Sequence, residues 1–256
     1  MSAASALPSV TVITVVYNGG VLFERTLRAV AALRHPALDY VVVDGGSTDG
    51  TLDLIRQDAG RTITRWVSER DAGIYDAMNK GLALARGDFV WFLNAGDTPA
   101  DTDVLESLFA DGAADDYYYG DTALVDNAGA TSKIAIAPPA ITPTLMMRGM
   151  QVSHQSILVR RSVAPLYDLR YRFIADQKWI IESMRRARSG RYAGFVLSRY
   201  LLGGLSSRRY GRFLLEKMRY SFDELHWLPA AWLSLFDLAK AARFYAGTAL
   251  RRWRVL

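Results

Sequence analysis

The spacing of apolar residues switches repeatedly along the first hundred positions, and these switches predict alternating strands and helices. Short apolar or β-branched runs have the length of strands, and the segments between them place apolar residues at helical intervals. Strands that alternate with helices in this way pair in parallel through right-handed crossovers, so the pattern predicts an α/β fold. The predicted strands are residues 10–16, 40–43, 63–67 and 89–93, and the predicted helices are residues 21–33, a segment with Ser47 as its N-cap that carries Leu52 and Ile55, and residues 73–85.

Beyond residue 100 the periodicity is weaker, and the chain divides into three regions at residues 8–100, 101–205 and 206–256. From residue 208 onward the sequence is helical throughout, apart from a break near Pro229, so we expect a helical C-terminal appendage. The elements expected in the middle region are helices at 102–109 and 175–187, strands at 117–119, 155–160 and 192–197, and an irregular connection at 126–149.

Composition narrows the classes of protein to which this chain can belong. It has no cysteine, which excludes disulfides, thiolate metal sites and a cysteine nucleophile. The first residues lack the basic and apolar parts of a secretory signal, and no uncharged stretch approaches the roughly 20 apolar residues of a membrane-spanning helix. We therefore expect a globular, cytoplasmic protein.

Charge is distributed unevenly along the chain. Residues 185–256 carry 15 Lys and Arg against 4 Asp and Glu, a net of +11, whereas residues 1–184 have a net charge of −6. This asymmetry indicates an anionic partner, either membrane headgroups or nucleic acid, and no nucleic-acid-binding motif supports the second. In residues 206–256 the cations alternate with aromatic and aliphatic residues at helical spacing, which suits an anionic bilayer surface. Alternatively, the apolar stripe packs on the rest of the protein and the cations are simply solvated.

Two carboxylates follow buried strands at the points where those strands end. Asp44 precedes Gly45-Gly46, and Asp97 closes the turn at residues 94–97. Open α/β folds bind ligands at the carboxyl edge of their parallel strands. These positions therefore predict a ligand site, with a solvated turn as the alternative for Asp44 and a structural role as the alternative for Asp97.

Four segments together resemble the inverting family 2 glycosyltransferases of the GT-A fold. They are residues 10–18, 41–50, 68–81 and 89–97, in the family's order, and the match is closest to the branch that builds bacterial exopolysaccharides, including colanic acid, and glycolipids. The resemblance implies a doubly wound mixed sheet with a Rossmann-like nucleotide-binding half at 8–100 and an acceptor-binding half at 101–205. It also implies sugar transfer, with inversion, from a nucleoside-diphosphate-sugar to a hydroxyl of a lipid-linked glycan or glycolipid.

The same resemblance assigns the donor-binding residues. Asp44 would contact the nucleobase, and the turn after the first strand would cradle it through Thr14, Tyr17 and Asn18. The second donor element consists of Asp71, Gly73, Asp76 and Lys80. Asp76 and Lys80 also have the spacing of an ordinary helical ion pair. Many relatives carry an arginine where this chain has Met78, so phosphate binding would depend more on Lys80 or on a metal ion.

A metal ion and a general base complete the implied site. Asn94-Ala95-Gly96-Asp97 is a variant of the Asp-x-Asp motif in which only Asp97 keeps a carboxylate to hold Mg²⁺ or Mn²⁺, while Asn94, Ala95 and Gly96 would face the donor. Asp176 stands where the family places its base, with a helix N-terminal role as the alternative. His154 is a further candidate for the metal or a phosphate, with a structural role as its alternative.

The implied protein is thus a metal-dependent enzyme associated with the inner face of the cytoplasmic membrane through residues 206–256. A non-catalytic module that binds sugar nucleotides or polysaccharides is the rival interpretation, because the metal motif is reduced to one carboxylate. The sequence leaves open the nucleobase, the sugar, the acceptor and homo-oligomer formation.

Overall fold

The computed structural model describes residues 7–203 and 210–224 of the chain. Contacts divide the chain into two compact units: Met1–Arg170 with Ala175–Gly203, and Tyr171–Ile174 with Gly204–Leu256. Among the described residues, no helix has the length and apolar character that a membrane crossing requires.

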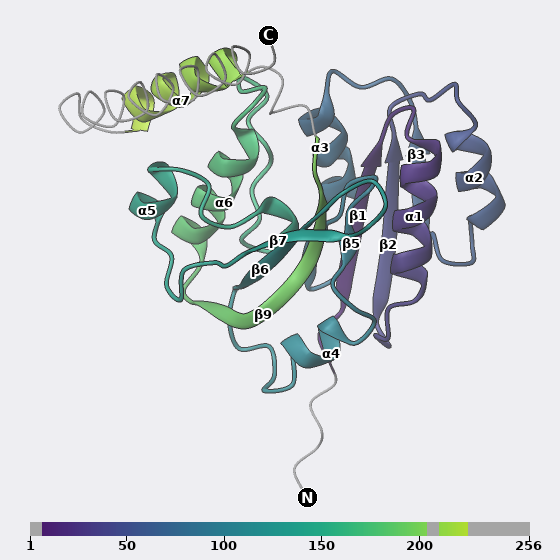
Figure 1. The fold of residues 1–256 in the computed structure, drawn as a ribbon, viewed down its shortest axis with the longest axis horizontal. Helices are drawn as coiled ribbons and strands as arrows, with labels where there is room; N and C mark the ends of the chain where they lie inside the picture. The colour runs from purple at the N-terminus through teal and green to yellow at the C-terminus, as the bar shows by residue number, and fades with distance from the viewer. Residues whose placement is uncertain (1–6, 204–209, 225–256) are drawn as a thin grey trace, which may run out of the picture. The chain divides into compact units, whose positions relative to one another are not determined.

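The first unit is built on one mixed sheet with the strand order β3-β2-β1-β4-β8-β6-β9-β5 (Figure 1). Its first four strands pair in parallel, as the alternation of strands and helices predicts. In this register Val16 lies beside Asp44, so the loops that follow β1 and β2 leave the sheet at the same edge. These strands are β3 (Arg65–Ser68), β2 (Leu38–Asp44), β1 (Val10–Val16) and β4 (Phe89–Phe92).

The remaining strands make the sheet mixed. β8 (Ile157–Arg160) runs antiparallel to both β4 and β6 (Tyr117–Val125), and β9 (Gly190–Leu201) runs parallel to β6. Two shorter additions are antiparallel, β5 (Thr98–Pro99) on β9 and β7 (Thr131–Ala135) on β6. β4 therefore joins the parallel part of the sheet to the mixed part, directly before the turn at residues 94–97.

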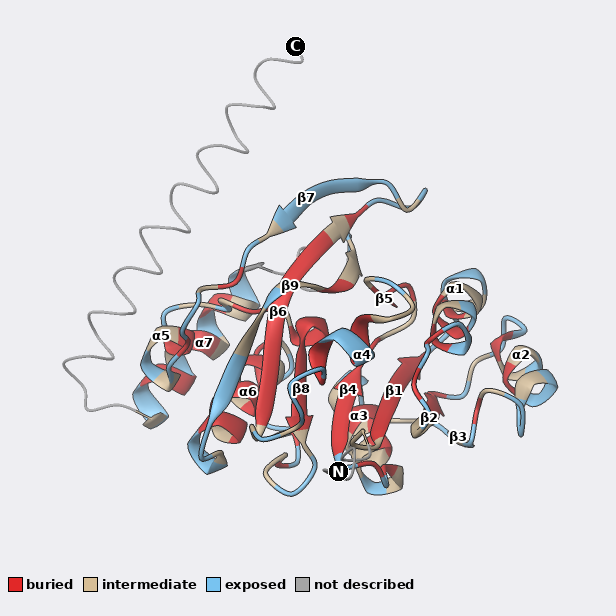
Figure 2. Cartoon of the chain, turned by 90° about the horizontal axis from the view of Figure 1, so that it is seen from below, coloured by how far each residue is buried: buried red, intermediate tan, exposed pale blue. Residues whose placement is uncertain are grey.

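Helices cover both faces of the parallel strands. α1 (Gly20–Ala31) packs its buried residues into one core cluster with alternate residues of β1, while α3 (Ile74–Leu84) lies on the opposite face. A Cβ on Gly81 would lie 2.4 Å from Ile13 Cγ2, so α3 approaches β1 as closely as a glycine permits. Figure 2 shows the buried strands between these helices. The others are α2 (Thr51–Asp58), α4 (Val104–Leu108), α5 (Pro143–Met147), α6 (Ala175–Arg186) and, in the second unit, α7 (Tyr210–Glu224).

Several local predictions were wrong. The segment 126–149 is not irregular: it contains β7, an exposed strand without an apolar face, and α5, which Thr142 caps and Pro143 begins. Ser47 is not a helix cap, because α2 starts four residues later with Gly50 at its N-cap. The third strand lies at 65–68, and β6 and β9 extend well beyond the predicted 117–119 and 192–197. Residues 225–256, predicted to be helical, lie outside the described part.

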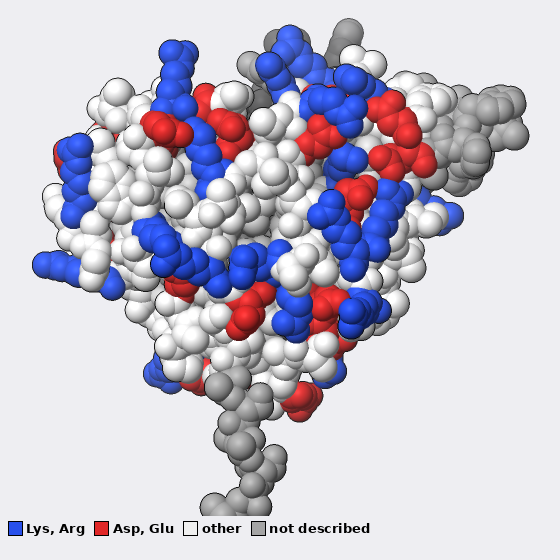
Figure 3. Space-filling view, turned by 180° about the vertical axis from the view of Figure 1, so that it is seen from behind, with Lys and Arg blue, Asp and Glu red and all other residues white. Residues whose placement is uncertain are grey.

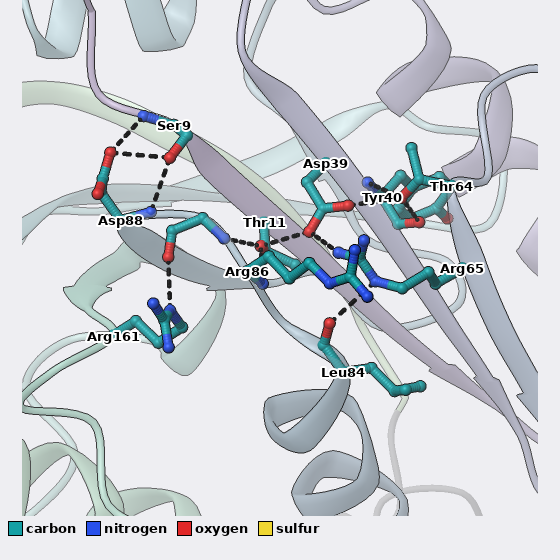
Figure 4. Close-up of polar contacts among 11 residues, drawn as sticks. Ser9, Thr11, Asp39, Tyr40, Thr64, Arg65, Leu84, Arg86, Asp88 and Arg161 are labelled. Atoms are coloured by element: carbon teal, nitrogen blue, oxygen red, sulfur yellow. Dashed lines mark hydrogen bonds and ion pairs between the residues drawn. The ribbon is translucent and has the colours of Figure 1, made fainter.

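A polar network fixes the amino edge of the sheet, opposite the predicted site (Figure 4). The Thr11 hydroxyl donates to Asp39 at 2.7 Å and accepts the backbone N–H groups of Arg86 and Gly87. Arg65 pairs with the same Asp39 carboxylate and donates to the carbonyl of Leu84. The end of α3 is thereby held to β1, β2 and β3.

Candidate functional site

The loops after β1 and β2 are joined by Asn18 and Ser47. Asn18 has a left-handed backbone with φ of 48°, which lets its side chain accept the N–H of Thr48 at 2.8 Å. Its own N–H donates to the Ser47 hydroxyl at 2.8 Å. The structure thus brings the predicted donor residue Asn18 to the predicted edge of the sheet, where it holds the two loops together.

Asp44 lies at the end of β2 but is fully buried. Its carboxylate accepts the Ser47 N–H at 3.0 Å, the Ser47 hydroxyl and, at 2.6 Å, the Ser68 hydroxyl. This explains why Ser47 does not cap α2, since its hydroxyl is used on Asp44. A nucleobase could reach the Asp44 carboxylate only if these serines moved, so in this structure Asp44 orders the loop.

Tyr17 and Asp71 meet on the open side of the same loop. Tyr17 is 66% exposed, and a Cβ on Gly45 would lie 2.5 Å from Asp71 Oδ2 and 3.4 Å from Tyr17 Cβ. The Asp71 carboxylate therefore occupies the space that a side chain at residue 45 would fill. Its other oxygen accepts the N–H of Gly73 at 2.9 Å, and Gly73 precedes α3 with φ of 133°. These three predicted donor residues form an accessible rim.

Lys80 is held by partners on α3 and the loop before it. Its ammonium lies 2.8 Å from the Glu69 carboxylate and 3.6 Å from that of Asp76, and it donates to the Arg70 carbonyl. The hydrogen bond to Glu69 is the main reason why the pKa of Lys80 is raised. Asp76 in turn accepts the N–H of Ala72 at 3.0 Å. The predicted alternative, an i,i+4 ion pair, is therefore present, and a phosphate would compete with Glu69 for Lys80.

Thr14 is fully buried and does not reach the rim. Its hydroxyl donates to the Leu93 carbonyl at 2.7 Å and accepts from the Tyr40 hydroxyl at 3.0 Å. It thus joins the end of β1 to the end of β4, directly before the turn at residues 94–97.

That turn carries two oxygen-bearing side chains. The Asp97 carboxylate is 4% exposed and accepts the Leu201 N–H at 3.1 Å. Burial raises the pKa of Asp97 to about 7, although hydrogen bonds from Leu201 and Gln155 oppose the rise. Asn94 Oδ1 is buried and has no hydrogen-bond partner among the described residues.

The donor set of this turn fits a hard divalent cation. Mg²⁺ and Mn²⁺ prefer carboxylate and amide oxygens, which Asp97 and Asn94 supply. No group of three or more His, Cys, Asp or Glu side chains suited to a metal occurs in the described ranges. Most of the coordination sphere would therefore have to come from a phosphate ligand and water.

Asp176 is the second residue of α6 and lies in the same site as Asp97. Its carboxylate accepts the Gln177 N–H at 2.8 Å, and burial raises its pKa to about 6, opposed by hydrogen bonds that include one from Tyr75. Burial also raises the pKa of Tyr200, and the charges of both Asp97 and Asp176 add to that rise. The phenol of Tyr200 therefore lies within the field of both carboxylates.

His154 sits in a 3-10 turn inside an aromatic cluster. Its Nε2 shares a hydrogen bond with the Tyr167 hydroxyl at 2.5 Å, and its ring packs against Phe92 and Trp179. Burial lowers the pKa of His154 to about 3, so the ring is neutral. These contacts favour the structural alternative for His154 over metal binding.

No sequence pattern pointed to the residues that connect this aromatic cluster to Asp176. Tyr75 stacks on Tyr167 with ring centroids 5.5 Å apart, and Tyr167 stacks on Trp179 at 5.3 Å. The side chain of Asn79 bonds both the N–H and the carbonyl of Tyr167, at 2.7 and 3.0 Å. Only the fold brings these distant residues together.

Comparison with known proteins agrees with this architecture. The family model described as glycosyl transferase family 2 matches residues 11–143. A PGL/p-HBAD biosynthesis glycosyltransferase of Mycobacterium bovis is 30% identical over 227 residues, covering 84% of this chain and 86% of its own length. The crystal structure of residues 1–349 of S. aureus TarS with UDP-GlcNAc superposes with a TM-score of 0.66 at 18% identity, covering 90% of this chain and 71% of that TarS segment. A mannosyltransferase of Pyrobaculum calidifontis in complex with GDP-Man and Mn²⁺ has a TM-score of 0.63 at 18% identity, covering 97% of this chain and 84% of its own.

Proposed function

This chain belongs to glycosyl transferase family 2 and is a glycosyltransferase with the GT-A fold, and we propose that it is a metal-dependent, inverting enzyme. It would transfer a sugar from a nucleoside-diphosphate-sugar to a hydroxyl of a lipid-linked glycan or glycolipid. The observation that carries the proposal is the placement of two carboxylates whose charges both act on the phenol of Tyr200: Asp97, which is buried, and Asp176, which is half-buried. One ends the turn after β4, and the other begins α6.

Asp176 is the general base in this proposal. As the acceptor oxygen attacks the anomeric carbon, the Asp176 carboxylate takes the proton of the hydroxyl. The bond to the nucleoside diphosphate breaks on the opposite face, so a single displacement inverts the configuration. With a pKa of about 6, the carboxylate is ionised at neutral pH and still basic enough to accept the proton.

Asp97 and Asn94 would hold the metal ion, which supplies positive charge to the departing diphosphate. The nucleobase would lie on the rim formed by Tyr17, Asp71 and Gly73, which are accessible to solvent. Support for the donor class comes from two proteins of the same fold, of which one is in complex with UDP-GlcNAc and the other with GDP-Man and Mn²⁺.

A panel of nucleoside diphosphates tests the donor and the metal together. Thermal unfolding of the wild type with UDP, GDP, ADP or TDP should show stabilisation by at least one of them, larger with Mn²⁺ than with EDTA. Asp97→Ala should lose the part that depends on Mn²⁺. Stabilisation that is the same with and without Mn²⁺ would contradict the metal dependence. Donor binding without sugar transfer to any glycolipid extract would favour the rival binding module.

We also propose that the C-terminal region docks on an anionic membrane surface. In α7, cations and apolar side chains recur at helical spacing among the exposed residues, namely Arg212, Leu215, Arg219 and Phe222, and Arg219 also pairs with the exposed Asp223 at 3.8 Å. Leu215 is 67% exposed and Phe222 is 48% exposed. Cations that flank exposed apolar side chains suit the headgroup region of a bilayer.

A further inference from the structure

The turn at residues 94–97 is built around the hydroxyl of a residue from another element. Thr26 lies in the second turn of α1 and is fully buried. Its hydroxyl accepts the Gly96 N–H at 2.9 Å and donates towards the Asp97 carbonyl at 2.8 Å, with the Asn94 carbonyl 3.3 Å away. The Gly96 N–H is shared with the Leu22 carbonyl at 3.1 Å, and the Thr26 hydroxyl is the group that joins this N–H to a carbonyl of the same turn.

We propose that Thr26 is a positioning residue that sets the direction of the Asp97 carboxylate and the Asn94 amide. Gly96 has φ of 102°, so the turn depends on a backbone conformation that few residues adopt. The Thr26 hydroxyl joins the N–H of Gly96 to the carbonyl of the next residue and holds that conformation. A buried backbone group that loses its hydrogen-bond partner destabilises the folded state, so these bonds restrict rotation of the turn.

The opposite side of the turn is held by β9. The Leu201 N–H donates to Asp97 Oδ1 at 3.1 Å, and a Cβ on Gly96 would lie 2.8 Å from Leu201 Cδ2. Thr26 therefore fixes the backbone of the turn while Leu201 fixes one carboxylate oxygen. The Asp97 carboxylate also accepts a hydrogen bond from the Gln155 side chain, whereas Asn94 Oδ1 has no partner among the described residues, and these two groups are the candidates for the cation.

The same helix is anchored at its start to the loop after β2. The N–H of Gly20 donates to the Thr51 hydroxyl at 3.0 Å and to the Asp49 carboxylate at 3.1 Å. The N–H of Gly19 also donates to Thr51, at 3.2 Å. Helix α1 thus connects the loop of the proposed nucleobase rim to the proposed metal turn, which it contacts through the Thr26 hydroxyl and the Leu22 carbonyl.

This inference rests on the proposed function, in which Asp97 holds the cation, and Thr26→Val tests it. Valine keeps the shape of threonine but has no hydroxyl, whereas Thr26→Ser keeps the hydroxyl and serves as the rescue variant. Thr11→Val is the matched control: Thr11 is also fully buried and bridges backbone N–H groups to an acceptor, but at the opposite edge of β1 (Figure 4).

The first measurement needs no ligand. Amide hydrogen exchange should become faster in the segment 94–97 of Thr26→Val and stay at the wild-type rate in Thr26→Ser and Thr11→Val.

The second measurement is the affinity for Mn²⁺ in the presence of the nucleoside diphosphate that stabilises the wild type. Because outer-shell partners typically change metal affinity by about 10–100-fold, Thr26→Val should weaken Mn²⁺ binding within that range. The affinity of the nucleotide with EDTA should not change.

Different results separate this inference from the proposed function. Unchanged exchange in Thr26→Val, or equal effects in Thr26→Ser, would overturn the role of the hydroxyl even if the wild type binds Mn²⁺. Faster exchange with unchanged Mn²⁺ affinity would also overturn it, because the turn would then not position the ligands. If the wild type shows no Mn²⁺-dependent binding, the proposed metal dependence fails, and with it the positioning role, although the exchange result still stands for the turn.

Discussion

Loss of solvation raises the pKa of the Asp97 carboxyl to about 7 and that of the Asp176 carboxyl to about 6, both well above the usual range for this group. A buried carboxylate without an adjacent cation is unfavourable for folding when it is ionised. Perturbed groups of this kind concentrate at functional sites, where a base needs a pKa near the working pH. Asp97 and Asp176 thus have the raised pKa that is expected of carboxyls at a functional site, in addition to their place in the fold.

Asp176→Asn should reduce turnover by about 10²–10⁴-fold, since an amide keeps the shape of the side chain but cannot take a proton. Binding of the nucleoside diphosphate should be retained, because the donor contacts lie on other loops. Steady-state transfer rates and calorimetric affinities check this. A rate close to wild type would place the base elsewhere. Asp121, a buried carboxylate of β6, would then be the next residue to test as the base; it accepts hydrogen bonds from the Ala137 N–H at 2.9 Å and the Tyr192 hydroxyl at 2.7 Å.

The pKa of Asp176 also predicts how stability depends on pH. Its folded-state pKa of about 6 exceeds the unfolded value, so its contribution to stability is fully present below the unfolded pKa of roughly 4 and is lost as pH rises through 6. Asp176→Asn should therefore gain free energy of unfolding relative to wild type between pH 4 and pH 7, by up to about 3 kcal/mol. Denaturant titrations at both pH values measure the difference. A difference that does not vary with pH would show that the folded pKa is not raised.

The sequence predicted which residues end strands, but it did not predict which of them remain accessible. Asp44 and Thr14 were expected to meet the donor, yet both are fully buried and hold neighbouring segments. Asp97 was placed correctly after β4. Thr26, which contacts the turn that carries Asp97, fits the apolar stripe of α1, so its role in the turn could not be predicted from its spacing. A hydrogen bond between residues 70 positions apart depends on the tertiary packing of α1 on the turn.

At the scale of elements, the strands and helices that bury apolar side chains were predictable, whether they are buried throughout, like β1 and β4, or on one face, like α3. β1, β4 and α3 carry apolar patterns that match their burial. β7 is exposed along nearly its whole length, so pairing with β6, rather than apolar spacing, makes it a strand. α5 is only five residues long and has too few turns to show a period. Both lie in the segment predicted to be irregular.

Helix α7 is joined to the segment that leads into α6. The Glu216 carboxylate accepts the N–H groups of Arg172 and Phe173, at 2.9 and 2.7 Å, and the Tyr171 hydroxyl donates to Asp223 at 2.8 Å. Asp176 follows only three residues after Phe173. Removing α7 would therefore free the backbone just before the proposed base, so a truncation would disturb catalysis as well as any docking surface.

At the scale of the whole molecule, the net charge of +11 lies in residues 185–256, while residues 1–184 are acidic overall. On the face shown in Figure 3, Lys and Arg side chains are interspersed with Asp and Glu rather than gathered into one field. An alternating surface of this kind attracts an anionic bilayer weakly, since charges of opposite sign cancel within a Debye length of about 8–10 Å. Attraction is therefore expected from the C-terminal region.

We accordingly predict that the protein sediments with vesicles containing anionic lipids at low salt and is released as salt rises. Each cation near the surface contributes about 1 kcal/mol, and Leu215 and Phe222 add apolar burial on insertion.

Because truncation would also remove Glu216, the sharper variant is Leu215→Ser with Phe222→Ser, which leaves the contacts of Glu216 and Asp223 intact. Leu166→Ser, at a leucine that is 69% exposed in the other unit, is the matched control. The double variant should lose most vesicle binding and keep nucleotide binding, while the control keeps both. If the wild type does not sediment with anionic vesicles even at low salt, these cations are only solvated and α7 has no role at a membrane.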